Sequence, residues 1–541
     1  MTDTSEPGDS GLPHRRAPST VGGEQVPAPQ PERRPPPDRT ARILAIAIPA
    51  VLGVIGAVLI AVLVLGDRAP VDVGPRGGGE RAATPVPPGT PISGMPAGGG
   101  SAGTRPGQAA AGGSGAAGQP GQAPGAGGPG MGAGGPTTIS GGGAGATFSG
   151  TGTWPRFRNS NFNATSEQNV GLARSWPAGG PRKVWSLKML GPGHAGAAIY
   201  QGRVFVLDYD VGKREDALRC LSLADGSEIW RTSYPVEIKD NHGISRTVPA
   251  VTERFVVSLG PMGHVTCART DSGEVLWQVD LVKTYGTRIP GWYAGQCPLV
   301  DGGKAIIAPG GSALMVAIDC ASGQVIWKTP NPKGWHMTHA SITPISLGGQ
   351  KTYVYPTTGG VGGVKASDGS LLWEYTGYTV NTAHVPSPVG VGDNRAFLTG
   401  GYGAGSVMLR INGASASPVW RIPQNVFGSH QHTPILYQNH LFGVAMDRQF
   451  VCLDLSGKRV WSSGHTTTFG IGPYILAEGM FYILSDDGTL VLAEASLSAW
   501  RELARAKVLA GPDAWAPMAL ADGMLVCRDR DTMVCLDVKN P

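Results

Sequence analysis

Cysteine is scarce in this chain, with seven residues among 541. No two cysteines are adjacent and no C-x-x-C pair occurs, so the sequence has neither a disulfide scaffold nor a c-type haem attachment site. Charged residues are also few, at 15%, and the formal net charge is only +5. Because the C-terminal half has no lysine- or arginine-rich run, a nucleic-acid partner is not expected.

The cysteines recur at one position of a repeat instead of forming local pairs. This position holds Cys220, Cys267, Cys452 and Cys535. Equivalent positions of neighbouring repeats lie too far apart for an S–S bond, so we expect small buried hydrophobic residues there. A cross-strand bridge between Cys527 and Cys535 remains an alternative.

Residues 43–66 form a run of 24 residues without a charge. About 20 apolar residues suffice for a helix to cross a bilayer, so the run predicts a transmembrane helix. It is too long for the apolar part of a signal peptide, and no A-x-A cleavage site follows. The arginines that flank it are Arg33, Arg34, Arg39 and Arg42 before the run, and Arg68 and Arg76 after it. This bias predicts a single-pass protein with a cytoplasmic N-terminus and an extracytoplasmic (periplasmic) C-terminal part.

Glycine and proline are abundant, with 83 and 45 residues, and the excess is greatest before residue 150. Residues 1–42 are rich in proline and polar residues, which predicts a disordered cytoplasmic tail. Residues 67–150 are dominated by glycine, alanine and proline. Such a segment has too few large apolar groups to offset the entropy of ordering, so it predicts a disordered linker between membrane and cargo.

Beyond about residue 175 short apolar strands alternate with turns, and helical periodicity is hard to find. One unit reads "TVPAVTERFVVSLGPMGHVTCARTDSGEVLWQVD". It contains four strands, namely "VPAV", "RFVVSL", "HVTCAR" and "EVLWQV". The "DSG" or "DG" that joins the last two strands suits the backbone angles of a hairpin turn.

A tryptophan closes each unit. It recurs at Trp185, Trp230, Trp277, Trp327, Trp373, Trp420, Trp461 and Trp500, with a period of 39 to 50 residues. That period is typical of a propeller with one four-stranded sheet per blade. We expect each indole to pack between adjacent blades. A proline, which suits a strand start, opens the units at Pro249, Pro298, Pro344, Pro388, Pro434, Pro473 and Pro517.

The two ends of the repeat array complement each other. Trp185 lies in "KVWSLKM", a fourth-strand pattern that no first three strands precede. The C-terminal "APMALADGMLVCRDRDTMVCLDVKNP" supplies three strands and ends before any tryptophan. The sequence therefore predicts an all-β, eight-bladed propeller over residues 151–541, closed by pairing of its N- and C-terminal strands.

The strand, Asp/Ser-Gly turn and closing tryptophan resemble the tryptophan-docking repeat of PQQ-type (pyrroloquinoline quinone) β-propellers. The resemblance covers residues 154–541, and the lead-in "WPRFR" resembles exported bacterial BamB-like repeat proteins. It implies either a protein-binding scaffold, as in outer-membrane β-barrel assembly, or a quinoprotein dehydrogenase with PQQ and usually Ca²⁺ on the axis. No Cys-Cys dipeptide is present, and the strand entrances offer few carboxylates, chiefly Asp513 and Asp240. No cofactor is therefore predicted, although PQQ stays an alternative.

Polar residues gather just before the opening strands. This set comprises His194, His242, Tyr293, Gln296, His339, His384, His430, His432 and Asp513. Loops that enter the innermost strands reach the propeller axis, so these side chains should converge on one mouth. Histidine suits metal ligation and acid–base chemistry. Three interpretations stay open, namely histidines that satisfy loop carbonyls or line a wet channel, a small-ligand or metal site, and catalysis.

No nucleophile, carboxylate pair or H-E-x-x-H motif accompanies this set, so no catalytic residue is assigned. The sequence favours a membrane-anchored, extracytoplasmic propeller that acts as a scaffold for protein partners in the cell envelope. The alternatives are a PQQ-dependent oxidoreductase and a sensor that binds a small ligand or metal at the histidine-rich mouth.

Overall fold

The computed structural model describes residues 137–141 and 148–540. The predicted cytoplasmic tail, the predicted transmembrane helix at 43–66 and most of the predicted linker lie outside these ranges. Within them, no helix has the length and hydrophobicity that a membrane span requires. The prediction of a membrane anchor therefore stays a prediction.

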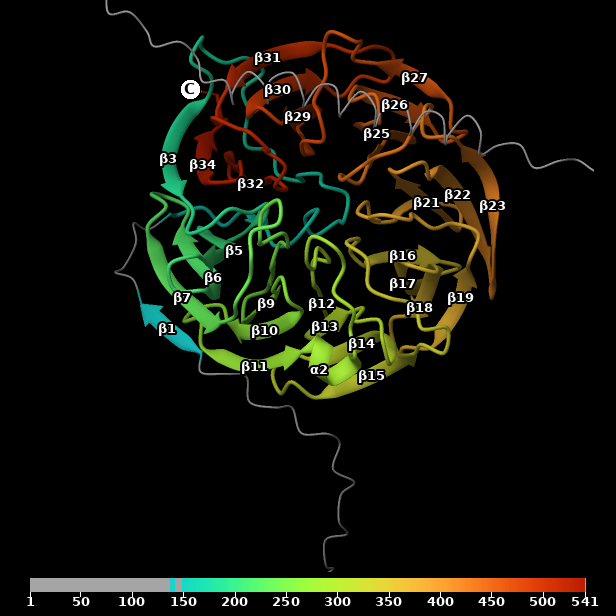
Figure 1. Cartoon of the computed structure of the whole chain (residues 1–541). Helices are drawn as coiled ribbons and strands as arrows, with labels where there is room; N and C mark the ends of the chain where they lie inside the picture. Colours follow the sequence, from blue (N-terminus) through green and yellow to red (C-terminus); the bar gives the residue numbers. More distant parts are fainter. Residues whose placement is uncertain (1–136, 142–147, 541) are drawn as a thin grey trace, which may run out of the picture. The chain divides into compact units, whose positions relative to one another are not determined.

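Eight antiparallel sheets form a ring, which confirms the predicted all-β propeller (Figure 1). In each blade the first strand lies nearest the axis and the fourth lies at the perimeter (Figure 1). The strands of blades 1 to 4 are β4 (Ala197–Tyr200), β5 (Arg203–Asp210), β6 (Glu215–Ser222) and β7 (Glu228–Pro235); β8 (Ala250–Val251), β9 (Phe255–Leu259), β10 (His264–Arg269) and β11 (Val275–Asp280); β12 (Leu299–Asp301), β13 (Lys304–Ile307), β14 (Ala313–Asp319) and β15 (Val325–Pro330); and β16 (Thr343–Leu347), β17 (Gln350–Thr357), β18 (Gly360–Lys365) and β19 (Leu371–Tyr375).

The remaining blades follow the same order. Their strands are β20 (Val389–Gly392), β21 (Arg395–Gly400), β22 (Gly405–Asn412) and β23 (Ser415–Ile422) in blade 5; β24 (Ile435–Tyr437), β25 (His440–Val444), β26 (Phe450–Asp454) and β27 (Arg459–Ser462) in blade 6; β28 (Tyr474–Ala477), β29 (Met480–Leu484), β30 (Thr489–Glu494) and β31 (Glu502–Lys507) in blade 7; and β32 (Ala519–Ala521), β33 (Met524–Arg528), β34 (Thr532–Asp537) and β3 (Arg182–Lys188) in blade 8. A short helix, α2 (Leu281–Tyr285), follows β11.

The ring closes as the sequence predicts. β3 comes from the N-terminal side of the propeller and pairs with β34, the last strand of the chain. In this pairing Trp185 lies opposite Cys535, and the register runs from Arg182 opposite Asp537 to Lys188 opposite Thr532. Blade 8 therefore joins both ends of the propeller through main-chain hydrogen bonds.

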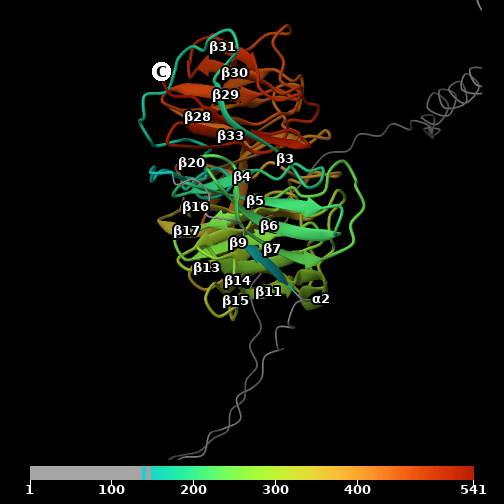
Figure 2. The ribbon, with the colours of Figure 1, turned by 90° about the vertical axis from the view of Figure 1, so that its left-hand side faces the viewer.

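Blade 1 departs from the predicted four strands because it has six. β2 (Thr153–Trp154) pairs with the innermost strand β4, and β1 (Thr138–Gly141) pairs with the outer edge of β7 (Figures 1 and 2). β1 falls inside the segment 67–150, which the sequence predicts to be a disordered linker. All four of its residues are exposed, and main-chain pairing is what holds it in place.

The closing tryptophans dock on the next blade along the ring. Trp277 donates its indole N–H to the carbonyl of Cys320 at 2.9 Å and packs against Gly323, whose φ is 73°. Trp185 and Trp230 bond Leu223 and Thr270 in the same way. Each buried indole contributes about 3 kcal/mol or more, judged by typical losses on truncation.

Trp500 does not occupy the docking position, which corrects the sequence-based assignment. In blade 7 the bulge of the outer pair falls between Leu492 and Ala493, and Ala504 faces Leu492 where a tryptophan stands in other blades. The turn before β31 is longer than in other blades, so Trp500 precedes the strand. Its ring lies 5.7 Å from that of Phe469, in a cluster of aromatic side chains.

The seven cysteines are all buried and free, which confirms the prediction for the repeated position. In blade 8, Cys535 lies opposite Val526 and Cys527 lies opposite Val534. The Cys527–Cys535 bridge does not form because the two residues are not directly paired across the strands.

Residues 153–166, called the lead-in segment below, cross the propeller axis. Their backbone bonds Val251 of blade 2 and Leu476 of blade 7, and Arg156 donates to the carbonyl of Val300 in blade 3 at 2.8 Å. Blades 2 and 3 lie opposite blades 6 and 7 in the ring (Figure 1). The lead-in segment therefore spans the channel from side to side.

Arg158 fixes the lead-in segment to the far wall of the channel. Its buried guanidinium donates to the carbonyls of Thr433 at 2.6 Å, Pro434 at 2.8 Å and Phe162 at 3.0 Å. Desolvation lowers the pKa of Arg158 to about 10. The three carbonyls satisfy the donors of a cation that would otherwise be costly to bury.

Candidate functional site

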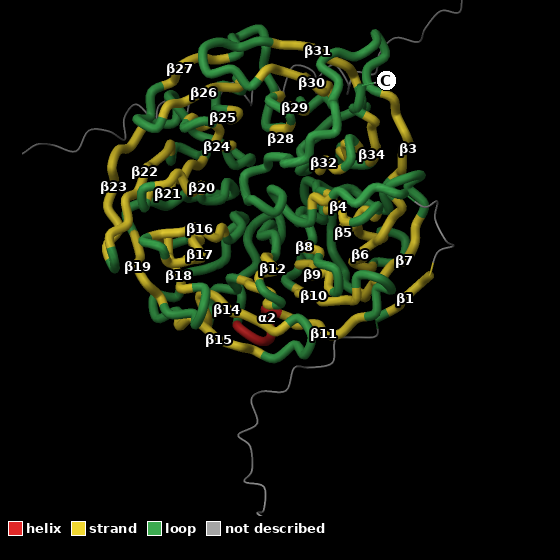
Figure 3. Tube along the Cα trace, turned by 180° about the vertical axis from the view of Figure 1, so that it is seen from behind, coloured by secondary structure: helices red, strands yellow, loops and turns green. Residues whose placement is uncertain are grey.

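A cavity of about 310 Å³ lies at the axis, between the loops that lead into the innermost strands. We call these segments the entrance loops, and they gather at the centre of the ring (Figure 3). Every blade contributes to the lining, through His194, Arg246, Trp292, His339, Val385, His432, Ile471 and Trp515 in chain order. Phe157 of the lead-in segment also lines the cavity, so the segment that crosses the channel forms its floor.

Five of the nine predicted site residues meet in this cavity. They are His194, His242, His339, His430 and His432. Convergence of the entrance loops, which the repeat pattern implies, is what brings them together. The other four have different roles.

Gln296 and His384 turn away from the cavity into the protein interior. The Gln296 amide donates to Ala308 O at 3.1 Å and Tyr355 Oη at 2.9 Å, and accepts from Ala308 N. His384 is buried edge-on against Tyr378, and desolvation lowers its pKa to about 3. Both side chains therefore support the fold.

Tyr293 and Asp513 belong to entrance loops but do not line the cavity. The Tyr293 hydroxyl donates to the carbonyl of Lys239 in blade 2. Asp513 has φ near 61°, and its carbonyl accepts from the amide of Trp515 at 2.8 Å. Tyr293 ties two entrance loops together, and Asp513 shapes the loop that presents Trp515.

Three of the cavity histidines bond carbonyls of neighbouring loops. The Nε2–H groups of His194, His339 and His432 donate to His242 O at 2.9 Å, Gly291 O at 2.7 Å and Trp515 O at 3.1 Å. Desolvation lowers their pKa values to about 3, 4 and 4. These imidazoles are neutral at physiological pH and join entrance loops of different blades. The arrangement corresponds to the interpretation in which histidines satisfy loop carbonyls.

A second set of bonds, which the sequence analysis missed, joins successive blades beneath the histidines. The amides of Val248, Cys297, Ser341 and Ser387 donate to Cys297 Sγ, Ser341 Oγ, Ser387 Oγ and Thr433 Oγ1, respectively, at 2.8 to 3.2 Å. Amides at the start of an innermost strand need partners outside the sheet. The signal was available, because a Cys, Ser or Thr directly precedes four of the seven opening prolines.

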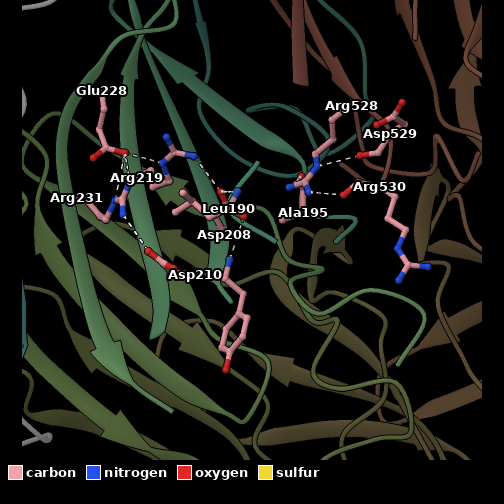
Figure 4. A network of polar contacts seen from close by, with 11 residues as sticks. Leu190, Ala195, Asp208, Asp210, Arg219, Glu228, Arg231, Arg528, Asp529 and Arg530 are labelled. Atoms are coloured by element: carbon pink, nitrogen blue, oxygen red, sulfur yellow. Dashed lines mark hydrogen bonds and ion pairs between the residues drawn. The ribbon is translucent and has the colours of Figure 1, made fainter. Parts of the chain in front are cut away.

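A polar network supports the entrance loop of blade 1, which carries His194 (Figure 4). The buried carboxylate of Asp208 accepts from Leu190 N at 2.9 Å and from Arg219 Nη1 at 2.9 Å. At the other end of the loop, Ala195 O accepts from Arg528 of blade 8 at 3.5 Å. The loop is therefore fixed to both blades that it separates.

Arg246 is the cavity residue that sequence reasoning missed. It belongs to the entrance loop of blade 2 and lines the cavity. Desolvation lowers its pKa to about 10, while Asp240 acts in the opposite direction. A lone arginine before an opening strand has no motif that marks it as a site residue.

Aromatic side chains complete the lining. Trp515 stacks near His194, with ring centroids 5.0 Å apart, and its indole N–H donates to Asp486 at 2.8 Å. An adjoining cavity of about 380 Å³ shares Tyr402, His430 and Trp515, and adds Arg448. The mouth therefore combines flat apolar surfaces with two arginines, an arrangement suited to binding.

Comparisons with known proteins agree with this architecture. The family model described as outer membrane protein assembly factor BamB matches residues 214–456. The protein of that name from Vibrio cholerae is 29% identical over 146 residues, which are 27% of this chain and 35% of the relative. The chain thus matches about a third of the length of that relative. The propeller is similar to this family over residues 214–456.

Solved structures of PQQ-like propellers match over more of the chain. A europium-containing methanol dehydrogenase is 13% identical, covers 71% of this chain and 89% of its own, and gives a TM-score of 0.51. BamB from Moraxella catarrhalis is 13% identical over 66% of this chain and 99% of its own, with a TM-score of 0.47. At this identity the dehydrogenase structure shows the shared fold alone.

The cavity lining does not fit a Ca²⁺-bound quinone of the kind that PQQ-like dehydrogenases hold. Ca²⁺ takes several oxygen ligands, usually carboxylates. No Asp or Glu lines the axial cavity of the described propeller, and residues 137–141 and 148–540 contain no group of three potential metal ligands. Asp486, in the adjoining cavity, already accepts bonds from Trp515 and from Ile471 N at 2.8 Å.

Proposed function

We propose that this protein is an extracytoplasmic scaffold that binds protein partners in the cell envelope through the mouth of its propeller. In this proposal the segment 43–66 anchors the chain, and the linker lets the propeller reach its partners. The family model and the Vibrio cholerae relative both bear the name of an outer membrane protein assembly factor. That name supports a role in which this chain binds other proteins.

The observation that carries the proposal is the cavity to which all eight blades contribute. Its walls are largely aromatic and aliphatic, and three of its five histidines are committed to carbonyls of adjacent loops. A site that is already ordered loses little entropy when a partner binds. Protruding side chains that fill such pockets usually provide most of the binding energy of an interface.

The proposal is tested by site-specific photo-crosslinking in intact cells that express the full chain. A photoreactive phenylalanine analogue replaces Tyr402 at the mouth, which is 43% exposed, or Ile326 on the outer strand β15, which is 49% exposed. We expect the same protein adduct in repeated experiments from position 402 and not from position 326. Equal adducts at both positions, or none from the mouth, would overturn the proposal.

A further inference from the structure

We infer that Arg246 is an anion anchor and that the axial cavity takes a carboxylate joined to an apolar or aromatic group. This inference rests on the proposed function, because a partner would supply such a group as its C-terminal residue. A free organic acid carries the same chemistry, so the two sources are separated by experiment.

The guanidinium of Arg246 is held in place by main-chain carbonyls. Its Nη2 donates to Asn241 O at 3.0 Å, His242 O at 2.8 Å and Gly243 O at 3.2 Å, and its Nε donates to Trp292 O. These bonds come from the entrance loops of blades 2 and 3. They fix the plane of the guanidinium, so its position does not depend on a ligand.

One side of this guanidinium remains available. Within residues 137–141 and 148–540, Nη1 of Arg246 makes no hydrogen bond and no carboxylate lies within ion-pair distance. The acid of the same loop, Asp240, forms its ion pair with Arg530 instead. Asp240 acts on Arg246 from a distance and forms no ion pair with it. A mostly desolvated cation without a direct ion pair gains strongly from an incoming anion, because charge-assisted bonds are stronger in a site of low polarity.

The electrostatic surroundings favour an anion over a cation. Arg246, Arg528 and Arg530 all act on His194, and together with desolvation they favour its neutral form. The neighbouring imidazoles of His194 and His339 therefore add no charge to the cavity. The positive potential at this end of the cavity comes from the arginines.

Backbone conformation gives an independent indication of a binding site. Three non-glycine residues that line the cavity have left-handed φ values, namely His242 at 54°, Trp292 at 61° and Tyr402 at 52°. Such conformations cost free energy and are concentrated where a fold must present particular groups. The carbonyls of two of these residues, His242 and Trp292, also accept hydrogen bonds from Arg246.

The remainder of the lining defines the other half of the ligand. Phe157, Trp292, Val385, Ile471 and Trp515 present apolar surfaces in the same cavity. A volume of about 310 Å³ lies at the small end of ligand sites, so one amino-acid residue or a small acid fits better than a long chain.

The test measures binding of three probes to the purified full chain by titration calorimetry. The probes are the peptide Gly-Ser-Gly-Ser-Gly-Phe with a free carboxylate, the same peptide as its C-terminal amide, and N-acetylphenylalanine. We expect the acid peptide to bind and the amide to bind at least about tenfold more weakly, because a charge-assisted bond is lost. Equal binding of acid and amide, or no binding of either, overturns the inference.

Variants locate the anchor. Arg246→Gln should weaken the affinity for the acid peptide at least about tenfold. The control is Arg214→Gln in blade 1, where the arginine side chain is 71% exposed; this variant should leave the affinity unchanged. If Arg246→Gln fails to fold, Arg246→Lys keeps the charge and should retain the preference for acid over amide. An unchanged affinity in Arg246→Gln overturns the assignment.

The outcomes separate this inference from the proposed function. If partners crosslink at the mouth but the acid and amide peptides bind equally, the proposed scaffold function stands and the assignment of Arg246 as an anion anchor is wrong. N-acetylphenylalanine that binds as tightly as the peptide identifies a free acid as the source, whereas tighter binding of the peptide identifies a chain terminus.

Discussion

Replacing Gly273 with alanine should destabilise the propeller far more than the same replacement at Gly413. Both glycines lie in turns between the third and fourth strands of a blade, with φ of 76° and 58°. A Cβ at Gly273 would lie 2.5 Å from Cε3 of the buried Trp230 of the preceding blade. A Cβ at Gly413 would meet no heavy atom within 4 Å.

The expected magnitudes follow from these geometries. Left-handed backbone costs an alanine about 1 kcal/mol relative to glycine at either site. Overlap with the indole adds about 1 to 3 kcal/mol, because the buried ring and its sheet must shift. Gly273→Ala should therefore cost about 2 to 4 kcal/mol and Gly413→Ala about 1 kcal/mol.

Equilibrium unfolding of the full chain in urea, followed by far-ultraviolet circular dichroism, measures both losses. Thermal midpoints provide a second ranking of the two variants by stability. Equal losses in the two variants would refute the reasoning, because Gly273 would then serve its own turn alone and not the docking of the neighbouring blade.

Three further predictions test the interior. Desolvation raises the pKa of Asp216 from 3.8 to about 7, so the folded chain holds a proton that the unfolded chain releases, and stability contributed by this group is lost as pH rises through that window. Asp216→Asn should remove this loss, seen as a smaller fall in the urea midpoint between pH 5 and 8 than in the wild type. Arg158→Met should cost about 3 kcal/mol or more by removing three buried hydrogen bonds, while Arg174→Met, at an exposed site, should be neutral in the same assay. Trp277→Ala should cost about 3 to 5 kcal/mol; a similar loss for the partly buried Trp500, which lacks the docking position, would contradict the register of blade 7.

The propeller was predictable because its instructions are local and repeated. The docking tryptophan, the turn glycine and the opening proline each act within one blade, and the unmatched patterns at the two ends imply the β3–β34 pair. β1 was not predictable, because four exposed residues that bind through main-chain groups leave no side-chain signature. The sequence placed Trp500 wrongly because a change in turn length alters register without altering the apparent period.

The sequence predicts which loops form the site, but it does not predict which of their side chains point into the cavity. The repeat places His194 and Gln296 in equivalent entrance loops, yet only His194 reaches the cavity. Gln296 turns inward because the buried Tyr355 hydroxyl and Ala308 backbone need its amide. Arg246 could not be inferred because its role depends on the fold of its own loop and on the Trp292 carbonyl of another blade.

The two strands that close the ring, β3 and β34, are far apart in the sequence. The ring therefore cannot close until β34 has been synthesised. β3 is synthesised well before β34, so the edge of β3 that pairs with β34 has no partner until Thr532–Asp537 is made. A chain that ends before Thr532 would leave this edge open to the β34 of a complete copy, a route to strand exchange between molecules. The segment Thr532–Asp537 therefore decides whether the ring closes within one molecule or joins two.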